Sequence, residues 1–288
     1  MRTAILSIMT LALFGITLSA GAADMQKGAN ETSVKVMTFN IRTFMFTDGK
    51  DFWPFRKDEV TKLVKSYSPD IIGFQEVTRY QIDDLKRQLK SYESFGKGRQ
   101  GGKSGERCPI FYKKDRFELL DYGTFWLSES PNDPGSRSWD AAFPRIVTWG
   151  EFKSKKTGQV FHFFNTHFDH QGVMARRNSA RLMVEKIVAI AGEGPAIAAG
   201  DFNMTDDTEP YQTMTSLLSD TRTVTETEPE GPEGTGRNFD AGSKPKRRID
   251  YIFVSEEWTV KSYRVIDDTY GNDRRPSDHM PVMAHIKL

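Results

Sequence analysis

The chain has 288 residues, of which 38% are hydrophobic and 12% aromatic, so it can bury a sizeable core and is not an intrinsically disordered protein. Its 40 lysines and arginines nearly balance its 39 acidic residues. This balance excludes a strongly basic protein that binds nucleic acid indiscriminately, and any attraction to a polyanion must come from local patches.

The first 23 residues have the pattern of a secretory signal peptide. Arg2 gives a positive start, Ile5–Leu18 is mostly apolar, and Ser19–Ala23 offers the small residues that suit cleavage. The apolar run is too short for a stable membrane anchor. We therefore expect a secreted or periplasmic protein in which residues 24–33 form a short linker.

Strand and helix patterns alternate at the start of the remaining chain. Val34–Ile41 and Asp70–Val77 are mostly apolar runs of strand length. Lys57–Tyr67, between them, has apolar residues at helical spacing, and a further helix is expected after the second strand. The apolar residues of that further helix are Ile82, Leu85 and Leu89.

The middle of the chain is richer in strand patterns. The expected strands are Ile110–Lys113, Phe117–Leu127, Ile146–Phe152 and Val160–Thr166. Lys155–Gly158 predicts a hairpin turn between the last two, and Met174–Ala191 predicts a long helix. The apolar run PAIAAGDF, which ends at Phe202, predicts a buried strand that runs into a loop.

The C-terminal part predicts three more strands and completes a single domain over residues 34–288. These strands are Ile249–Val254, Trp258–Ile266 and Val282–Ile286. Lys97–Gly105 and Thr225–Gly236 are rich in glycine or proline and predict surface loops. Neither loop marks a domain boundary, because candidate catalytic residues lie on both sides of each.

Cys108 is the only cysteine, so the chain forms no internal disulfide and its stability must come from the core. The residue lies in the apolar stretch CPIFY, and no suitably arranged partner signature accompanies it. We therefore interpret it as a buried small hydrophobe rather than a nucleophile.

Polar residues lie at the ends of several predicted strands or directly after them, and one pair precedes the last strand. Turn-forming residues are common at such places, but a rigid scaffold also presents its functional groups there. The residues in question are Asn40, Glu76, His167, Asp201, Asn203, Asp278 and His279. Their types, which include carboxylates, amides and imidazoles at one strand end after another, favour a functional site.

The motifs around these residues resemble the endonuclease/exonuclease/phosphatase family, which includes DNase I-like nucleases, deadenylases, sphingomyelinases and inositol-phosphate phosphatases. The motifs TFNI, DIIGFQEV, NTHFDH, GDFN, RRIDYIFV and SDHMPV occur in the family's order over about residues 34–288. Stretches such as GTFWLSESP and SWDAAFPRIVTW resemble a bacterial branch nearest the deadenylase-like members. The resemblance implies a four-layer α/β sandwich, with two mixed β-sheets face to face and helices outside.

The resemblance also implies a metal site. Glu76 matches the family's metal-binding glutamate, Asn40 lies beside it in the family pattern, and Asp278 stands where a further metal-site carboxylate is often found. Oxygen ligands suit Mg²⁺ or Mn²⁺.

Four further positions match catalytic residues of the family. Asp201 matches the aspartate that orients or deprotonates the attacking water, and Asn203 the asparagine that holds the phosphate or the nucleophile. His279 matches the histidine that contacts the phosphate or moves a proton, and Asp250 matches the carboxylate that orients this histidine.

A second histidine completes the resemblance. His167 stands where DNase I-like members have a histidine, Glu106 aligns with the acidic partner of that histidine, and Arg145 aligns with a phosphate-binding arginine. A carboxylate bonded to each imidazole is expected to raise its pKa and to fix its tautomer. His170 contacts substrate or is a solvated loop histidine.

Other motifs have weaker functional interpretations. HFDH does not match the helical zinc pattern, and GKGRQGGKSGE lacks the spacing of a P-loop. Lys244–Arg248 is either a solvated basic loop or a grip on a substrate phosphate. Trp53, Phe55 and Trp126 either stack on a base or belong to the core.

The sequence therefore predicts a metal-dependent phosphoesterase that cleaves a phosphodiester in nucleic acid or nucleotides by in-line attack of water. The alternative is an enzyme for a sugar phosphate, an inositol phosphate or a phospholipid of the sphingomyelin type. A binding protein on an inactive scaffold is a third possibility, but every matched position holds a chemically competent residue. No obligate protein partner is evident.

Overall fold

Two mixed β-sheets, each of six strands, organise the part of the chain that the structure describes. The structure is a computed structural model that describes residues 31–236, 238–243, 245 and 247–288. The expected signal peptide and most of the expected linker lie outside the described residues. Thr32–Leu288 forms one compact unit.

The first sheet combines strands from both ends of this unit, in the order β11-β12-β1-β2-β4-β3. β1 pairs in parallel with β2 and antiparallel with β12, and the other pairs are antiparallel. The strands are β1 (Ser33–Asn40), β2 (Ile71–Gln75), β3 (Tyr92–Phe95), β4 (Ile110–Lys113), β11 (Thr259–Val265) and β12 (Val282–Lys287).

The second sheet has the order β5-β6-β7-β8-β10-β9. β7 and β8 are parallel, and their neighbours are antiparallel. The strands are β5 (Phe117–Trp126), β6 (Ile146–Ser154), β7 (Val160–His167), β8 (Ala196–Asp201), β9 (Ser219–Asp220) and β10 (Asp250–Val254).

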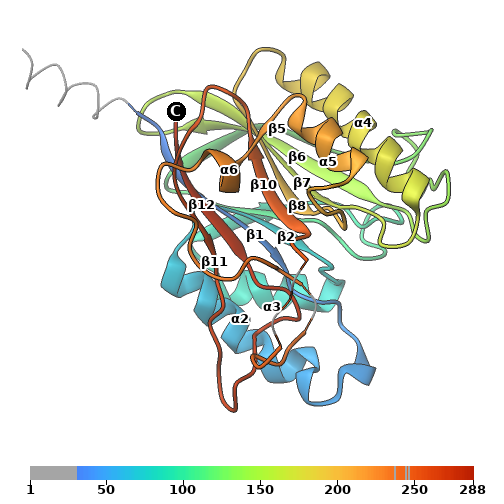
Figure 1. Ribbon diagram of the computed structural model, residues 1–288, viewed down its shortest axis with the longest axis vertical. Coiled ribbons are helices and arrows are strands. Elements are labelled where there is room, and N and C mark those ends of the chain that lie inside the picture. Colours follow the sequence, from blue (N-terminus) through green and yellow to red (C-terminus); the bar gives the residue numbers. More distant parts are fainter. Residues whose placement is uncertain (1–30, 237, 244, 246) are drawn as a thin grey trace, which may run out of the picture. The chain divides into compact units, whose positions relative to one another are not determined.

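Helices cover the outer face of each sheet. Figure 1 shows α2 and α3 beside the first sheet and α4 and α5 beside the second. The helices are η1 (Phe46–Asp51), α2 (Trp53–Tyr67), α3 (Arg79–Gln88), α4 (Val173–Ala191), α5 (Glu209–Thr215) and α6 (Thr221–Val224). Separate apolar clusters join each helix pair to its sheet. The expected four-layer α/β sandwich is confirmed.

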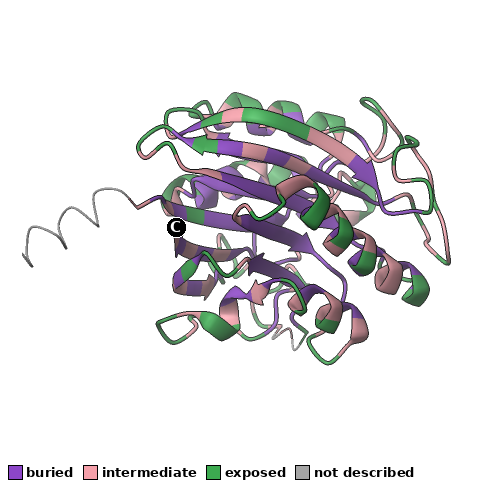
Figure 2. Ribbon diagram, turned by 90° about the horizontal axis from the view of Figure 1, so that it is seen from above, coloured by how far each residue is buried: buried purple, intermediate pink, exposed green. Residues whose placement is uncertain are grey.

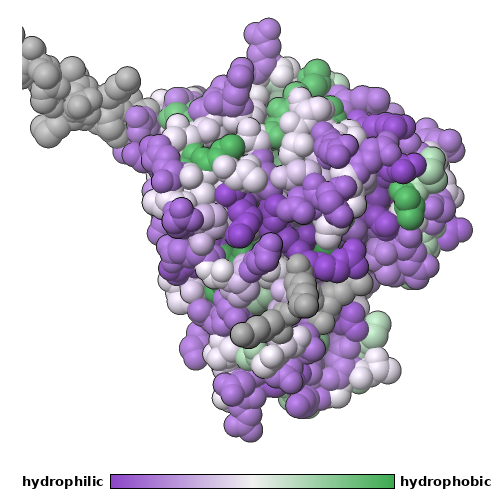
Figure 3. All heavy atoms as spheres, in the orientation of Figure 1, coloured by the Kyte–Doolittle hydropathy of each residue, from purple (hydrophilic) through white to green (hydrophobic). Residues whose placement is uncertain are grey.

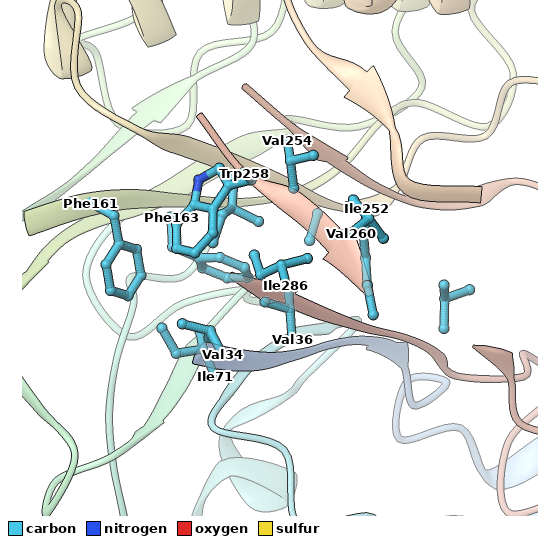
Figure 4. Close-up of a cluster of buried hydrophobic side chains, with 14 of the residues drawn as sticks. Val34, Val36, Ile71, Phe161, Phe163, Ile252, Val254, Trp258, Val260 and Ile286 are labelled. Carbon is cyan, nitrogen blue, oxygen red and sulfur yellow. The ribbon is translucent and has the colours of Figure 1, made fainter. Parts of the chain in front are cut away.

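The main core lies between the sheets. Successive residues of a strand point to opposite faces, so Val34 and Val36 of β1 enter the intersheet cluster while Met37 and Phe39 pack on the helix side. Figure 4 shows Val34 with Phe161, which comes from the second sheet, in this cluster. Each such side chain contributes roughly 1.5–3 kcal/mol by burial. Figure 2 shows buried residues along the strands and exposed residues on the outer helices.

The predicted strands and long helices are present, with shifted ends. α2 begins at Trp53 rather than at Lys57, because Pro54 favours the first turn of a helix. The hairpin turn before Val160 is confirmed, and Gly158 has a φ of +79° there. The short elements were not predicted, namely β3, β9, η1, α5 and α6. They span too few residues to show a periodic pattern.

Both of the expected surface loops are partly buried. Gly98 is buried because the loop folds back on itself, with its backbone N–H bonded to the carbonyl of Gly102. Thr235 is fully buried, and its hydroxyl accepts hydrogen bonds from the backbone N–H of Ile249 and Asp250 at 3.0 and 3.1 Å. The second loop therefore helps to place Asp250.

The stacking interpretation is wrong for two of the three aromatic residues, because Trp53 and Trp126 belong to the core. Phe55 is exposed. Cys108 is buried, and burial raises the pKa of its thiol to about 12, which agrees with a non-nucleophilic role.

Hydrophilic residues cover most of the face in Figure 3, and hydrophobic residues form only small separate areas on it. Within the described residues, we find no helix whose length and apolar character would let it span a lipid bilayer.

Candidate active site

Polar side chains replace apolar ones at one end of the intersheet core. The inward row of β1 begins with Val34 and ends with Asn40, and the inward row of β8 begins with Ile197 and ends with Asp201. Strand register then brings side chains together from neighbouring strands, because Asp201 lies opposite His167 on one side and opposite Asp250 on the other. The site therefore lies where the two sheets meet.

A buried polar layer separates this site from the apolar core. The amide Nε2 of Gln75 donates to the Thr38 hydroxyl at 3.0 Å and to Asn165 Oδ1 at 2.7 Å. Asn165 Nδ2 donates to the carbonyls of Phe74 and Pro109 at 2.8 and 2.9 Å. These bonds tie the two sheets together directly below the site.

The layer needs a glycine on β2. A Cβ added to Gly73 would lie 2.6 Å from Asn165 Oδ1, which is closer than non-bonded atoms approach. Gln75 and Asn165 were not predicted as site residues, although both stand inside the quoted motifs. Their structural role depends on contacts between the two sheets, which a sequence motif does not reveal.

A row of hydrogen bonds runs through the centre of the site. Asn40 Nδ2 donates to Glu76 Oε1 and to Asp201 Oδ2, both at 3.0 Å. At one end of the row, the backbone N–H of Thr43 donates to Glu76 Oε2 at 2.8 Å. At the other end, the backbone N–H of Asn203 donates to Asp201 Oδ1 at 3.0 Å.

Two members of the row have strained backbones. Glu76 has a φ of +61° and Asn203 a φ of +47°, in the left-handed region that residues with a Cβ seldom adopt. Such conformations persist only where the surroundings hold them, and they are typical of functional sites. Asn203 Nδ2 also donates to the carbonyl of Phe168 at 3.1 Å.

His279 is placed between two aspartates. Its Nδ1 lies 2.9 Å from Asp250 Oδ2, and its Nε2 lies 3.7 Å from Asp201 Oδ2. Burial alone would lower the pKa of His279, but the charges of Asp250 and Asp201 raise it well above its usual value. The predicted pairing of His279 with Asp250 is thus observed, and the two carboxylates favour the protonated imidazole.

The pKa of Asp201 is also raised, but in a carboxyl group this favours the neutral form. Burial and the nearby charge of Asp250 raise the pKa of Asp201 to about 7. A carboxylate with a pKa near neutrality can accept a proton from water and release it again. This supports the role that the family resemblance implies for Asp201.

His167 does not behave as expected from the sequence. Burial and the positive charge of Arg145 hold the pKa of His167 well below its usual value, so this imidazole is neutral. Its Nε2 lies 3.4 Å from Asp201 Oδ2. Glu106, its expected partner, instead pairs with Arg99 at 2.7 Å. The expectation that a carboxylate raises the pKa of each imidazole holds for His279 and is wrong for His167.

The guanidinium of Arg145 contacts two neighbouring side chains in the site. Its Nε lies 3.4 Å from Asp169 Oδ2, and its Nη2 lies 3.0 Å from His170 Nδ1. His170 lies on an exposed loop and also lines the cleft, and the ring of Phe143 stacks on it with the ring centroids 6.0 Å apart. Asp169 lies within the NTHFDH motif, which we interpreted only through its histidines. Arg99 was not predicted as a site residue, because it lies in a glycine-rich segment that we expected to be an exposed loop.

The loops after β1 and before β12 are fastened to each other. Ser277 donates its hydroxyl to the carbonyl of Asn40 at 2.7 Å. Arg56 of α2, which is fully buried, donates to the carbonyls of Ile41 and Pro276 at 2.5 and 3.1 Å. These bonds hold the loop that carries Asp278. The side chains of Asp278 and Glu76 line the same cleft.

The described residues of the basic segment Lys244–Arg248, which precedes β10, lie in different places. Arg248 is buried and pairs with Asp220 at 2.6 Å and with Asp206 at 3.2 Å, so both interpretations made from the sequence are wrong for this residue. Arg247 lines a neighbouring groove together with Asn203. Lys244 and Lys246 lie outside the described residues.

The residues at the row fit a divalent cation. Hydrogen bonds from Asn40 and Thr43 and the charge of His279 outweigh burial and hold the pKa of Glu76 below its usual value, so it is an anionic oxygen ligand. Burial raises the pKa of Asp278, whose Oδ2 lies 3.9 Å from Arg42 Nη1. Asp250 Oδ1 is buried and has no hydrogen-bond partner among the described residues. Buried carboxylate oxygens with few donors are what a hard cation neutralises.

A second arrangement of possible ligands overlaps the first. Side-chain atoms of Asp201, Asp250 and His279 lie within 4.8 Å of one another. Because His279 Nδ1 is already bonded to Asp250, the oxygen-rich group of Asn40, Glu76 and Asp278 is the better ligand set for Mg²⁺ or Mn²⁺. When bound, the ion would stabilise negative charge on the oxygens of a phosphoryl group.

These side chains surround an open cleft with a volume of about 310 Å³. The cleft has imidazole, guanidinium and carboxylate groups on all sides. Its lining residues are Arg42, Thr43, Met45, Glu76, Arg99, Glu106, Phe143, Arg145, His167, His170, Asp201, Asn203, Asp278 and His279. The structure thus brings together nine of the predicted site residues in one lining, and Asn40 and Asp250 support it from behind through the bonds described above.

Known proteins share this fold and much of this sequence. A protein of the endonuclease/exonuclease/phosphatase family from Bacteroides thetaiotaomicron is 39% identical, and the match covers 90% of this chain and 98% of that one with a TM-score of 0.86. The mannosyl-6-phosphatase of Bacteroides thetaiotaomicron VPI-5482 is also 39% identical, with 88% and 99% coverage and a TM-score of 0.84.

More distant structures share the fold alone. The catalytic domain of human nocturnin, solved with a bound sulfate anion, is 20% identical, with 88% and 93% coverage and a TM-score of 0.70. The profile of the endonuclease/exonuclease/phosphatase family matches residues 37–279, which include all the site residues described above. This chain therefore belongs to the endonuclease/exonuclease/phosphatase family, whose members are phosphoester hydrolases that generally depend on a divalent metal ion.

Proposed function

We propose that this enzyme hydrolyses a phosphate monoester of a sugar. The observation that carries the proposal is the 39% identity, over nearly the whole of both chains, to a protein described as a mannosyl-6-phosphatase. From the sequence, sugar phosphates were the alternative to nucleic acid and nucleotides. Cleft size and charge favour reversing that order.

The cleft has the size of a small-molecule site. Its volume of about 310 Å³ is at the lower end of the range for pockets that bind small ligands. Its arginines are also already paired, because Arg99 bonds to Glu106, Arg145 to Asp169 and Arg42 to Asp48. Among the described residues, the cleft itself therefore offers few unpaired arginines to a long polyanion, whose binding needs many lysines and arginines.

We infer the reaction from the roles that the family resemblance implies for these side chains and from their positions. A water held by Asp201 and Asn203 attacks phosphorus, and its oxygen forms a bond as the bond from phosphorus to the sugar oxygen breaks. Asp201 takes the proton of the water, and the sugar oxygen leaves as an alcohol after taking a proton from solvent. His279 and Arg145 donate hydrogen bonds to the phosphoryl oxygens, where negative charge increases.

The test is phosphate release by the purified protein from hexose 6-phosphates, in the presence of Mg²⁺, Mn²⁺ or EDTA. We expect release with a metal ion, none with EDTA, and a loss of at least about 100-fold in Asp201→Ala. Glu118→Gln is the matched control, because Glu118 is exposed on β5 and lines no cleft described here. Equal activity of Asp201→Ala and the wild type would contradict the assignment of the site.

Nucleic acid and nucleotides stay as the second prediction and form the other arm of the assay. Single-stranded RNA, single- and double-stranded DNA and nucleoside monophosphates are offered under the same conditions. Metal-dependent cleavage of these substrates, without activity on any sugar phosphate, would return the proposal to the nuclease function. A sphingomyelin sample tests the phospholipid alternative in the same way.

We further propose that residues 1–23 direct export of the chain, on the composition given above. Expression of the full sequence in a bacterial host, followed by N-terminal sequencing of the protein outside the cytoplasm, tests this. A new N-terminus at Asp24 is expected, and an intact Met1 on all of the protein would contradict it.

A further inference from the structure

A second groove lies next to the reaction cleft. It has a volume of about 380 Å³. Thr43, Arg99 and Glu106 line both the cleft and the groove, so the two are neighbours. Beyond these shared residues, the aromatic residues Phe44 and Tyr80 line the groove together with polar and basic residues that include Arg79, Gln100 and Lys103.

The order of the residues in the hydrogen-bonded row of the site indicates which part of the substrate faces the groove. The row begins with Thr43 and Glu76, passes through Asn40, and ends with Asp201 and Asn203. In an in-line displacement the leaving oxygen departs on the side opposite to the attacking water. If Asp201 and Asn203 hold the water, the leaving group lies toward Glu76 and Thr43, where the groove opens.

The aromatic wall is exposed and yet held in place. Tyr80 is 68% exposed, and its ring lies 5.5 Å from that of Phe44 at an angle of 40°. Phe44 packs edge-on against Phe52, with ring centroids 4.7 Å apart. An aromatic ring that stays exposed beside a reaction cleft offers a flat apolar face to a ligand.

The groove is also preformed. Gln81 of α3 donates its side-chain amide to the carbonyl of Arg42 at 2.7 Å, which ties the start of α3 to the loop that carries Phe44. Thr78 and Gln81 form a capping box at the start of the same helix. A ligand therefore meets a surface that is already ordered, and ordering it costs little binding energy.

From these observations we infer that the groove binds the leaving group of the substrate, by stacking a sugar ring on Tyr80 and Phe44. The inference rests on the proposed function, and it names the part of the substrate that the enzyme recognises. A sugar ring has an apolar C–H face that packs on an aromatic ring, and hydroxyls that polar side chains such as Gln100 can bind.

Tyr80→Ala tests the inference through two substrates. One is a hexose 6-phosphate, and the other is glycerol phosphate, a phosphomonoester without a ring. We expect kcat/KM of Tyr80→Ala to fall about three- to tenfold on the hexose phosphate, mainly through KM, and to stay unchanged on glycerol phosphate. Tyr80→Phe keeps the ring and should restore the wild-type value.

Two control variants make the result specific. Tyr122→Ala removes another exposed tyrosine, on β5, that lines no groove described here. Arg177→Ala alters the groove that adjoins Asn203 on the other side of the row. Neither variant should discriminate between the two substrates. A ring-selective loss in Arg177→Ala and none in Tyr80→Ala would overturn the assigned direction.

The remaining outcomes separate the inference from the proposed function. If the wild type hydrolyses hexose phosphates and Tyr80→Ala loses activity equally on both substrates, or on neither, the stacking inference is wrong and the proposed function stands. If the wild type hydrolyses no sugar phosphate, both fail. A Tyr80 dependence seen only with nucleoside monophosphates would show that the groove binds a base, which also overturns the sugar assignment.

Discussion

Asp169 orients the residues around Arg145 without any part in bond breaking. Its Oδ1 accepts the backbone N–H of Gln171 and Gly172 at 2.9 and 2.8 Å, and its Oδ2 accepts that of Ala142 at 3.0 Å. Burial alone would raise the pKa of Asp169, but these N–H groups and the charge of Arg145 lower it below its usual value. The ionised carboxylate therefore joins two loops of the site.

Asp169→Asn should destabilise the fold by about 1–3 kcal/mol at pH 7, because the charge-assisted bonds are lost. The sign of the pH dependence follows from the lowered pKa. The contribution is present above the unfolded-state pKa of about 3.9 and disappears as the pH falls through the lower folded-state value. Urea denaturation of both proteins between pH 7 and about pH 2 measures this, and the stability gap should stay constant down to about pH 4 and narrow below it. A stability gap that widens toward low pH would contradict it.

Asp250 acts on the reaction through His279. Replacing Asp250 with Asn keeps the shape of the side chain and removes the charge that favours the imidazolium. We expect kcat to fall by about 10²–10⁴-fold with the fold intact. Steady-state kinetics and circular dichroism check this, with Glu118→Gln as the control. A fall of less than threefold would show that His279 does not depend on this carboxylate.

At the scale of elements, α2 does more than cover the first sheet. Its buried Arg56 donates to four backbone carbonyls, those of Asp51, Ile41, Arg42 and Pro276. Burial lowers the pKa of Arg56 to about 10, and the carbonyls hold the guanidinium in place. One helix thereby positions the loop before Thr43 and the loop before Asp278.

Arg56→Ala should remove the Arg56 hydrogen bonds from these carbonyls, of which that of Arg42 keeps a bond from Gln81, and destabilise the protein by about 3 kcal/mol. Lysine has only three donors, so Arg56→Lys should recover part of the stability and not all of it. Urea denaturation gives the two values. The activity of the fraction that stays folded should also fall, because both loops carry site residues. Wild-type stability of Arg56→Ala would refute this role.

Most strands and long helices could be predicted because each shows its own period along the chain. The short strand β3 and the helix α5 could not, since both depend on packing against neighbours. The same difference applies to the site. Asp201 and His279 were found through motifs, whereas Gln75, Arg99 and Asp169 were missed. The neutral state of His167 was also missed, because it depends on burial and on a charge from a different loop.

At the scale of the whole molecule, the site joins the two sheets, so a bound metal ion should stabilise the entire fold. Glu76 comes from the first sheet and Asp201 from the second, and Asn40 links them. A ligand that binds only the folded state adds about 2.7 kcal/mol at 100 times its Kd. We expect Mg²⁺ or Mn²⁺ to raise Tm relative to EDTA.

Thermal unfolding monitored by circular dichroism measures this effect without any need for a substrate. Glu76→Gln should lose most of the rise in Tm, and Glu118→Gln should keep it. The same rise in Glu76→Gln and the wild type would place the ion elsewhere.

The pairing of β1 with β12 has a consequence for biosynthesis. Ser33 pairs with Lys287, so the central strand of the first sheet waits for the last strand before that edge is closed. A ribosome delivers the two strands at opposite ends of translation, and an open apolar strand edge invites aggregation in the meantime. The nascent chain should therefore depend on a chaperone until its synthesis is complete, and it should fold slowly afterwards, since such distant pairings are slow to form.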